Sequence, residues 1–430
     1  MRVYPPVLLD KLKNIWYEDI EDLKKAPDLL EDEHLLEFLE VAYHASFLTE
    51  EDRRIKFRIA LANVSESASF NEYGHFNLIQ FREKRIFNVK EIIKLAPATD
   101  FDQTIIGVYI ENNTLFIWGL IHIGNSWSEY HFNRNRSAIL PPNLLTISVN
   151  DPGNIEISRF GNTLLKLTNG GLDSPISDCF NKGPISAFFD TSFKEMLLEF
   201  TKNLNLEIEE FLSDEYNETP TSIWEAYTGF IKCILNEIKK KKHGGSLIII
   251  DSENPEKYLK SFKIKYPCSF NSAWDTVKKS EINLYKSYES FFYTLEMNKV
   301  SVEDFKENNV YNRDLKKWDG KYMELTKLFA SFSEVDGAVI IDDKLNLLGF
   351  GAEIIDTSNL KEIHIARDAD GTSTQSIPIE IYGTRHRSVF RFCSTHKDSL
   401  AFIISQDGDI KAVTQVEDKL TLWTSIDLES

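Results

Sequence analysis

The sequence has few cysteines, no long hydrophobic run and no excess of positive charge. Its four cysteines lie far apart in 430 residues and show no Cys-x-x-Cys or Cys/His spacing. Neither a zinc site nor a disulfide framework is therefore predicted. No apolar run approaches the length of a membrane span, and the segment behind the N-terminus is charged from Asp10 onward, unlike a signal peptide. We expect a cytoplasmic protein that does not bind membranes.

The charge balance excludes one large class of function. Lysine and arginine number 49 against 67 aspartates and glutamates, which gives a formal net charge of -18. A general nucleic-acid or membrane-surface binder needs a broad positive field, so no nucleic-acid partner is expected. A local cationic site for a small anionic ligand remains compatible with this acidic body. The length favours two or three domains.

The first 185 residues have the pattern of an α+β domain, with helices first and an antiparallel sheet after them. Apolar residues recur at helical spacing over 8–23 and again over 33–45. From residue 55 the apolar residues alternate instead, as in strands. An Asn-Asn pair at 112–113 joins two such runs and predicts a hairpin.

Aromatic residues of this first domain admit two interpretations. Trp118, Trp127 and Tyr130 can line a ligand pocket, or they can belong to the core and its rim. No convergent polar group accompanies them, which favours the core. The ligand of this domain is therefore unknown at this stage.

The second half is predicted to be an α/β domain over 220–430, preceded by a helical connector over 186–219. A helix that faces the core is expected over 223–238, because its apolar residues follow the i, i+3, i+4, i+7 rule. Four lysines and a Gly-Gly pair then mark its end. A continuously apolar run at 247–250 predicts a buried strand. Further helices are predicted over 273–297 and 315–332.

A basic turn at 383–387, Gly-Thr-Arg-His-Arg, follows a strand-like run at 377–382 and opens an apolar segment. A strand, a glycine turn and a helix start are expected here. Such a turn can bind a polyanion, because the first helical N–H groups are unpaired and arginine grips phosphate. The alternative is a solvated basic face.

A carboxylate precedes another buried strand. Asp336 is followed by a small pair, Gly337 and Ala338, and then by an apolar run. Asp336 can bind a divalent cation, since Mg²⁺ is held by one or two carboxylates together with substrate phosphates. The alternative is an Asp-Gly turn that only leads into the strand. The next run carries Gly349 and Gly351, where bulky side chains would block a pocket.

A fourth piece is the apolar strand expected at 401–404, which ends in Ser405, Gln406 and two aspartates. Asp407 and Asp409 can supply a second metal ligand or form a solvated Asp-Gly turn. Both interpretations remain open from the sequence.

In this order the four pieces resemble the diadenylate cyclase (DAC) domain of the DNA integrity scanning proteins. The resemblance rests on Asp-Gly-Ala at 336–338, Gly-Thr-Arg-His-Arg at 383–387 and Ile-Ser-Gln at 404–406, and it covers 220–430. The first half resembles the DACNV sensor domain that accompanies DAC domains. That second resemblance rests on Tyr4-Pro5, Leu-Ala-Pro-Ala at 95–98 and Ile-Trp-Gly-Leu at 117–120.

The resemblance implies an enzyme of α/β fold, with a mixed central sheet flanked by helices, that condenses two ATP into cyclic di-AMP and pyrophosphate. It implies Mg²⁺ or Mn²⁺ on Asp336, with Asp407 as the candidate second ligand, and a homodimer or higher homo-oligomer with DAC domains face to face. A catalytically inactive nucleotide-binding sensor or scaffold is the alternative. The polar stretch 367–376 is an ordered extension or a mobile lid. The implied catalytic residues are Asp336, Arg385, His386 and Arg387, and the implied nucleotide-binding residues are Gly337, Ala338, Gly349, Gly351, Gly383, Thr384, Ser405 and Gln406.

Overall fold

The computed structural model divides the chain into two compact units. The first unit is Met1–Pro175 with Glu429–Ser430, and the second is Ile176–Leu428. This division lies ten residues before the expected boundary at 185, and the helices expected as a connector belong to the second unit. The structure describes residues 5–17, 27–63, 77–123, 144–159, 162–168, 170–173, 176, 178–213, 219–296, 302–406, 408–426 and 428.

Two helices of the first unit, α1 (Pro5–Ile15) and α2 (Asp32–Ser46), form where the apolar spacing predicts them. The helix α4 (Val89–Leu95) and the 3-10 turn η3 (Ala96–Ala98) were not predicted and lie in the part expected to be sheet. Leu8 and Leu12 of α1 and Leu35 and Phe38 of α2 are fully buried. The predicted helix over 8–23 ends early, since α1 stops at Ile15, and residues 18–26 lie outside the described part.

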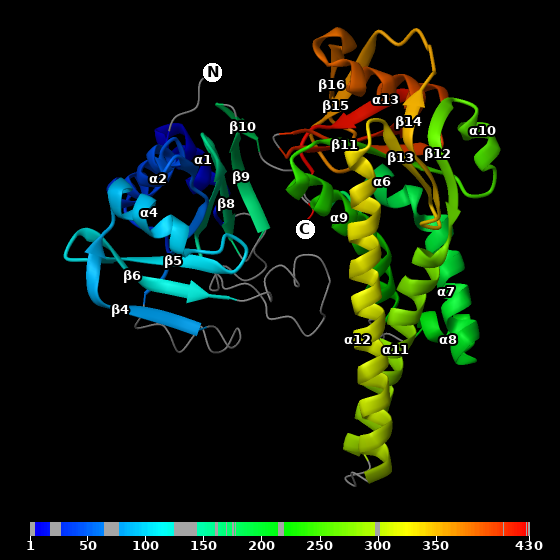
Figure 1. The fold of residues 1–430 in the computed structure, drawn as a ribbon, viewed down its shortest axis with the longest axis horizontal. Coiled ribbons are helices and arrows are strands. Elements are labelled where there is room, and N and C mark those ends of the chain that lie inside the picture. The colour runs from blue at the N-terminus through cyan, green and yellow to red at the C-terminus, as the bar shows by residue number, and fades with distance from the viewer. Residues whose placement is uncertain are drawn as a thin grey trace. The chain divides into compact units, whose positions relative to one another are not determined.

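An eight-stranded sheet forms the other layer of the first unit (Figure 1). Its spatial order is β10 (Gly171–Asp173), β9 (Asn162–Thr168), β8 (Asn154–Arg159), β7 (Thr146–Asp151), β3 (Phe57–Leu61), β5 (Thr104–Glu111), β6 (Thr114–His122) and β4 (Asn77–Ile86). The strands β1 (Thr49–Glu50) and β2 (Arg53–Arg54) form a separate ribbon. The Asn-Asn hairpin is confirmed, with φ of 48° at Asn112 and 62° at Asn113. The expectation of a purely antiparallel sheet is wrong, because β3 and β5 are parallel.

Trp118 belongs to the core of the first unit. Its side chain is only 3% exposed, and its indole N–H donates to the carbonyl of Ala62 at 2.9 Å. This burial confirms the core interpretation for Trp118 and removes it from any open pocket. Trp127 and Tyr130, the other two candidates for a pocket, lie outside the described residues.

The second unit is built on a mixed nine-stranded sheet. Its spatial order is β12 (Phe262–Phe270), β14 (Leu347–Ile354), β13 (Ala338–Asp342), β11 (Gly245–Ile250), β17 (Ser399–Ile404), β18 (Ile410–Val416), β19 (Lys419–Trp423), β15 (Glu362–Ala366) and β16 (Thr374–Pro378). The pairs β11/β13 and β15/β19 are parallel, and the other neighbours are antiparallel. The strands predicted at 247–250 and 401–404 are both buried along their whole length.

Helices cover this sheet, and two of them form a long hairpin. They are α6 (Gly183–Phe188), α7 (Asp190–Leu204), α8 (Ile208–Ser213), α9 (Thr219–Lys241), α10 (Pro255–Leu259), α11 (Ser272–Glu296), α12 (Val302–Ser331) and α13 (Thr384–Thr395), with 3-10 turns η4 (Phe332–Glu334) and η5 (Ile379–Ile381). The helices α11 and α12 run side by side away from the sheet (Figure 1). Among the described helices, none has both the length and the apolar character that a membrane crossing requires.

The two faces of this sheet pack against different segments of the unit. Ile248 and Ile250 of β11 share a core cluster with Phe390 of α13. On the other face, the ring of Phe402 stacks on Phe180 with centroids 5.7 Å apart. Because successive strand residues point to opposite faces, a strand buried on both faces is apolar throughout, as β11 is.

Candidate functional site

Strand register brings distant sequence motifs to one end of the second sheet. The strands β11 and β13 are parallel and begin together, so Ser246 lies beside Ala338. Ala338 also lies beside Ala352 of β14, and the last residue of β17, Ile404, lies beside Gly245. We call this end the glycine end, defined by Gly244, Gly337 and Gly351.

Gly337 and Gly351 hold two backbone segments in close contact. Gly337 has a φ of 124°, and a Cβ atom there would lie 2.5 Å from the carbonyl carbon of Gly351. Gly351 has a φ of 63°, and a Cβ there would lie 3.0 Å from the Val335 side chain. Both positions favour glycine for its conformation and for its small volume. The two glycines therefore let the segment that carries Asp336 pack directly on β14.

Asp336 stands at the entrance to β13, between η4 and Gly337. Its side chain is exposed, and its backbone carbonyl accepts a hydrogen bond from Nζ of Lys265 on β12 at 3.4 Å. The start of a buried strand fixes its position, because Ala338 is buried and paired on both sides. An exposed carboxylate on a fixed backbone is suited to bind a cation or a hydroxyl.

Arg385 reaches the glycine end from α13. A Cβ atom added at Gly244 would lie 3.2 Å from Nη1 of Arg385 and 3.4 Å from the backbone nitrogen of Gln406. Gly244 has a φ of 71°, as expected for the glycine that stops α9. The guanidinium of Arg385 therefore lies where β11 begins and β17 ends, and Gly244 leaves the space for it.

The start of α13 differs in part from the expected strand and turn. The predicted strand over 377–382 ends at Pro378, and η5 follows, because prolines suit strand ends and not strand interiors. Gly383 is the N-cap of α13, and its carbonyl accepts from the N–H of Arg387 at 3.1 Å. A Cβ added at Gly383 would meet no described atom within 4 Å. The side of the helix start next to Gly383 is therefore open, with Thr384 the first helical residue.

His386 packs among aromatic rings. Its ring stacks on Tyr382 with centroids 5.4 Å apart and meets Phe390 edge-on at 6.1 Å. Burial raises the pKa of Tyr382 above its usual value. This packing orients the imidazole and anchors the turn before α13.

Ser405 closes the turn between β17 and β18. The backbone N–H and the hydroxyl of Ser405 both bond to the carbonyl of Asp409, at 2.9 and 3.2 Å, and the N–H of Asp409 donates to the Ser405 hydroxyl at 3.0 Å. Gly408 has a φ of 90° in this turn. Ser405 and Asp409 thus build a turn, whereas Asp407, the predicted second metal ligand, lies outside the described residues.

Two predicted site residues lie apart from the glycine end. A Cβ added at Gly349 would lie 2.7 Å from the Ile264 side chain of β12, so this glycine allows β12 to approach β14. Arg387 lines a surface hollow with Arg391, whereas Arg385 lies beside Gly244. Residues two positions apart on a helix point about 200° apart, which separates the two arginines.

The donor groups at the glycine end fit one kind of metal binding. Within the described residues, no group of three or more histidines, cysteines, aspartates and glutamates can hold a metal ion. Mg²⁺ is commonly bound through one or two carboxylates together with substrate phosphates, and Asp336 supplies such a carboxylate. Asp336 therefore fits a metal that arrives with a phosphate ligand, and the described residues do not form an all-protein cage.

Residues 23–122 match a known family, described as probable sensor domain DACNV. This domain occurs in diadenylate cyclases. Two of the stretches that resemble it, 95–98 and 117–120, lie inside the match, at η3 and in β6, while Tyr4-Pro5 precedes it. No curated protein and no solved structure matches the chain.

This match places the sensor domain in the first unit and leaves the second unit without a family match. The helices α2 and α4 and the strands from β1 to β6 all lie within 23–122. The sheet of the first unit continues past residue 122 into β7 and beyond. For the second unit, the support for a DAC-like function therefore comes from the residues of the glycine end.

The polar stretch 367–376 is ordered: 367–373 form the turn between β15 and β16, and 374–376 begin β16. The Asp368 carboxylate accepts from the N–H of Thr372 at 2.9 Å and from the N–H of Ser373 at 3.0 Å. Burial alone would raise the pKa of Asp368, but these hydrogen bonds outweigh it and lower the pKa. The indole of Trp423 donates to the Asp368 carbonyl at 3.0 Å. Of the two interpretations, this bonding favours the ordered extension.

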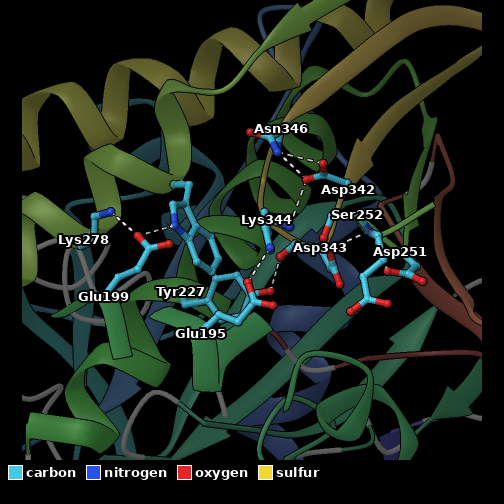
Figure 2. Close-up of polar contacts among 12 residues, drawn as sticks. Glu195, Glu199, Tyr227, Asp251, Ser252, Lys278, Asp342, Asp343, Lys344 and Asn346 are labelled. Atoms are coloured by element: carbon cyan, nitrogen blue, oxygen red, sulfur yellow. Dashed lines mark hydrogen bonds and ion pairs between the residues drawn. The ribbon is translucent and has the colours of Figure 1, made fainter. Parts of the chain in front are cut away.

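The opposite end of the same strands is acidic. Asp251 follows β11, Asp342 ends β13, and Asp343 comes next (Figure 2). We call this the acidic end, defined by these three aspartates. Asp342 and Asp343 are 4% and 8% exposed, and burial raises the pKa of both carboxyls.

Hydrogen bonds occupy the carboxylates of the acidic end. Asp342 accepts from the N–H groups of Lys344 and Asn346 at 3.0 and 2.8 Å and from the Asn346 side chain at 2.8 Å. Asp343 accepts from the N–H of Ser252 at 3.0 Å. The Tyr227 hydroxyl donates to the Asp343 carbonyl (Figure 2). These bonds connect the ends of β11 and β13, so the cluster has a structural role.

Helix α7 adds two glutamates near this end of the unit. Glu195 pairs with Lys344, and this contact raises the pKa of the lysine (Figure 2). Glu199 accepts from the indole of Trp274 at 3.2 Å and pairs with Lys278. The two glutamates attach α7 to the rest of the unit.

Sequence reasoning missed Lys265, and it missed Lys361 and Arg391, which line the same surface hollow as Arg387. Lys265 comes from β12, whose place beside β14 no local pattern reveals. The i, i+4 spacing of Arg387 and Arg391 was a usable signal, because residues four apart share one face of a helix. This spacing predicts that the side chains of Arg387 and Arg391 lie on the same face of α13.

Proposed function

We propose that the chain is a diadenylate cyclase regulated by its N-terminal sensor domain. The observation that carries this proposal is the convergence of Asp336, Gly337 and Arg385 at the glycine end. A carboxylate on a fixed backbone and a guanidinium are groups that a metal-bound nucleoside triphosphate requires of its site. The DACNV match at 23–122 supports the same function, because that domain occurs in diadenylate cyclases.

The residues of the glycine end have complementary roles in this proposal. Gly337 and Gly351 let β13 and β14 pack closely, which fixes the backbone beside Asp336. Arg385 and the start of α13 offset the negative charge of the phosphates. Asp336 would hold the Mg²⁺ or Mn²⁺ that accompanies the ATP. The bound metal ion would lower the pKa of the ribose 3′-hydroxyl and stabilise charge on the phosphate.

The reaction joins two ATP molecules symmetrically. Each 3′-oxygen forms a bond to the α-phosphorus of the other ATP, and the bond from that phosphorus to the β-phosphate oxygen breaks. Two pyrophosphates leave, and the two hydroxyl protons pass to water. Because each ATP provides the nucleophile for the other, two copies of the glycine end must face each other about a two-fold axis. We therefore propose a homodimer as the active state.

The test is product formation by the purified full chain. It is incubated with ATP and Mn²⁺ or Mg²⁺, and cyclic di-AMP is measured by mass spectrometry. Asp336→Asn should reduce the product at least about 100-fold, since it removes the metal ligand from the transition state. The matched control is Asp418→Asn, which removes an exposed carboxylate from the β18–β19 turn.

Each outcome decides between the two functions. Product from the wild type and from Asp418→Asn, but not from Asp336→Asn, supports the cyclase. ATP binding that depends on Arg385 without any product overturns the cyclase and leaves a nucleotide-binding sensor. Equal product from wild type and Asp336→Asn overturns the assigned site.

A further inference from the structure

A surface hollow lies on the side of α13 that carries Arg387. Its volume is about 510 Å³, which is within the range of small-molecule sites. We call it the α13 hollow. It is lined by Asn359, Leu360, Lys361, Glu362, Pro378, Ile379, Glu380, Arg387 and Arg391.

The α13 hollow contains more positive than negative groups, although the whole protein is acidic. Lys361, Arg387 and Arg391 stand against two glutamates. One of these, Glu362, already accepts a hydrogen bond from the Ser376 hydroxyl at 2.6 Å. The two arginines lie one helical turn apart, so they present their guanidinium groups to the same region.

Both arginines carry a buried donor that lacks an acceptor. The Nε atoms of Arg387 and Arg391 are buried and have no hydrogen-bond partner among the described residues. A buried donor without a partner costs free energy, and a ligand oxygen would remove that cost. Arginine binds phosphate through two parallel N–H groups, one of which can be Nε.

The remaining lining favours a ligand larger than a bare anion. Leu360, Pro378 and Ile379 supply apolar surface beside the cations. Such a lining can contact the carbon skeleton of a ligand while the arginines bind its charged group. An inorganic ion would leave both this surface and most of the volume unused.

We propose that the α13 hollow binds a small organic phosphate, with its phosphate on Arg387 and Arg391 and its carbon skeleton on Leu360, Pro378 and Ile379. This site is distinct from the glycine end, which Arg385 reaches from another side of the same helix. The proposal does not depend on cyclase activity. It gives Arg387 a different role from the triphosphate contact that the DAC resemblance implies.

The experiment is isothermal titration calorimetry with three probes: AMP, glycerol 3-phosphate and inorganic phosphate. It uses the full chain with Arg385→Ala, so that binding at the glycine end is weakened. Adding Arg391→Ala should weaken binding of an organic phosphate by about tenfold or more, because a charge-assisted hydrogen bond is lost. The matched control is Lys397→Ala, which removes an exposed cation just after α13.

A second variant distinguishes loss of the binding site from a folding defect of Arg391→Ala. Lys361→Ala changes an exposed side chain of the same hollow and should weaken binding in the same direction. Tighter binding of AMP than of glycerol 3-phosphate identifies a nucleotide ligand, and the reverse identifies another phosphate ester. Equal binding of inorganic and organic phosphate overturns the organic ligand. If Arg391→Ala and Lys361→Ala bind all three probes with the same affinity as Lys397→Ala, the proposed site is overturned.

Discussion

Two aspartates at opposite ends of β13 have very different surroundings. Asp336 lies two residues before the strand, at the glycine end, which Arg385 also reaches. Its side chain is exposed. Asp342, the last residue of the strand, is 4% exposed and accepts three hydrogen bonds. One strand thus carries a carboxylate that is available to a ligand and a carboxylate that is already used by the fold.

The difference shows why a cluster of acidic residues is weak evidence for a site. The acidic end has three aspartates, yet its two buried carboxylates accept hydrogen bonds from neighbouring N–H groups. At the glycine end, by contrast, the Asp336 side chain is exposed, and the closely packed Gly337 and Gly351 fix the backbone beside it. Free coordination capacity and space for a ligand, more than the number of carboxylates, mark the candidate site.

The sharpest test of this comparison exchanges the two aspartates for alanine. Asp342→Ala removes the acceptor of the part-buried N–H groups of Lys344 and Asn346 and leaves a cavity at a buried side chain, so the free energy of unfolding should fall by about 2–4 kcal/mol. Asp336→Ala removes an exposed side chain and should change it by less than about 0.5 kcal/mol. Urea denaturation of both variants measures the two values.

The activity assay should give the opposite ranking. Asp336→Ala should abolish cyclic di-AMP formation, while Asp342→Ala should retain activity at a temperature where it is folded. A larger stability loss from Asp336→Ala than from Asp342→Ala contradicts the assignment of the two ends.

A second comparison uses the same substitution at two glycines. Gly337→Ala requires a φ of 124° and places Cβ 2.5 Å from backbone, so it should cost about 2 kcal/mol or more. Gly383→Ala has a φ of -66° and open space, so it should cost less than about 1 kcal/mol. Thermal unfolding of both variants gives the ranking. Equal losses would show that Gly337 is not confined by Gly351.

Much of the second unit could be predicted from local patterns. Helix α9 follows from apolar residues at helical spacing, and its end follows from four lysines and Gly244. The buried strand β11 follows from its continuous apolar run. The helix at α13 followed from the glycine turn, but η5 did not, because a strand and a 3-10 turn share the same short apolar signal.

The candidate site was harder to predict, since it depends on strand order. No local pattern indicates that β14, β13, β11 and β17 are neighbours, so the meeting of Asp336 with Arg385 came only from a family resemblance. Helix geometry alone separates Arg385 from Arg387, yet the motif suggested one role for both. The bonds of Asp342 and Asp343 involve Asn346 and Ser252, and the second of these lies 91 positions away.

The smallest expected effect concerns the pH dependence of the acidic end. Burial raises the pKa of Asp343 in the folded protein above its unfolded value of about 3.9. The folded state therefore binds the proton more tightly, and this contribution to stability is present below pH of about 4 and is lost as the pH rises through the folded pKa. Asp343→Asn stays neutral and can still accept from Ser252, so it should gain stability relative to wild type between pH 4 and 7.

The measurement is the urea midpoint of wild type and Asp343→Asn at both pH values. Asp418→Asn is the matched control, because it makes the same substitution at an exposed carboxylate of the β18–β19 turn. Its difference from wild type should change little between pH 4 and pH 7, since exposed ion pairs contribute little to stability. An Asp343→Asn difference that is equally constant would mean that the carboxylate is as well solvated as Asp336, and the contrast between the two ends would fail.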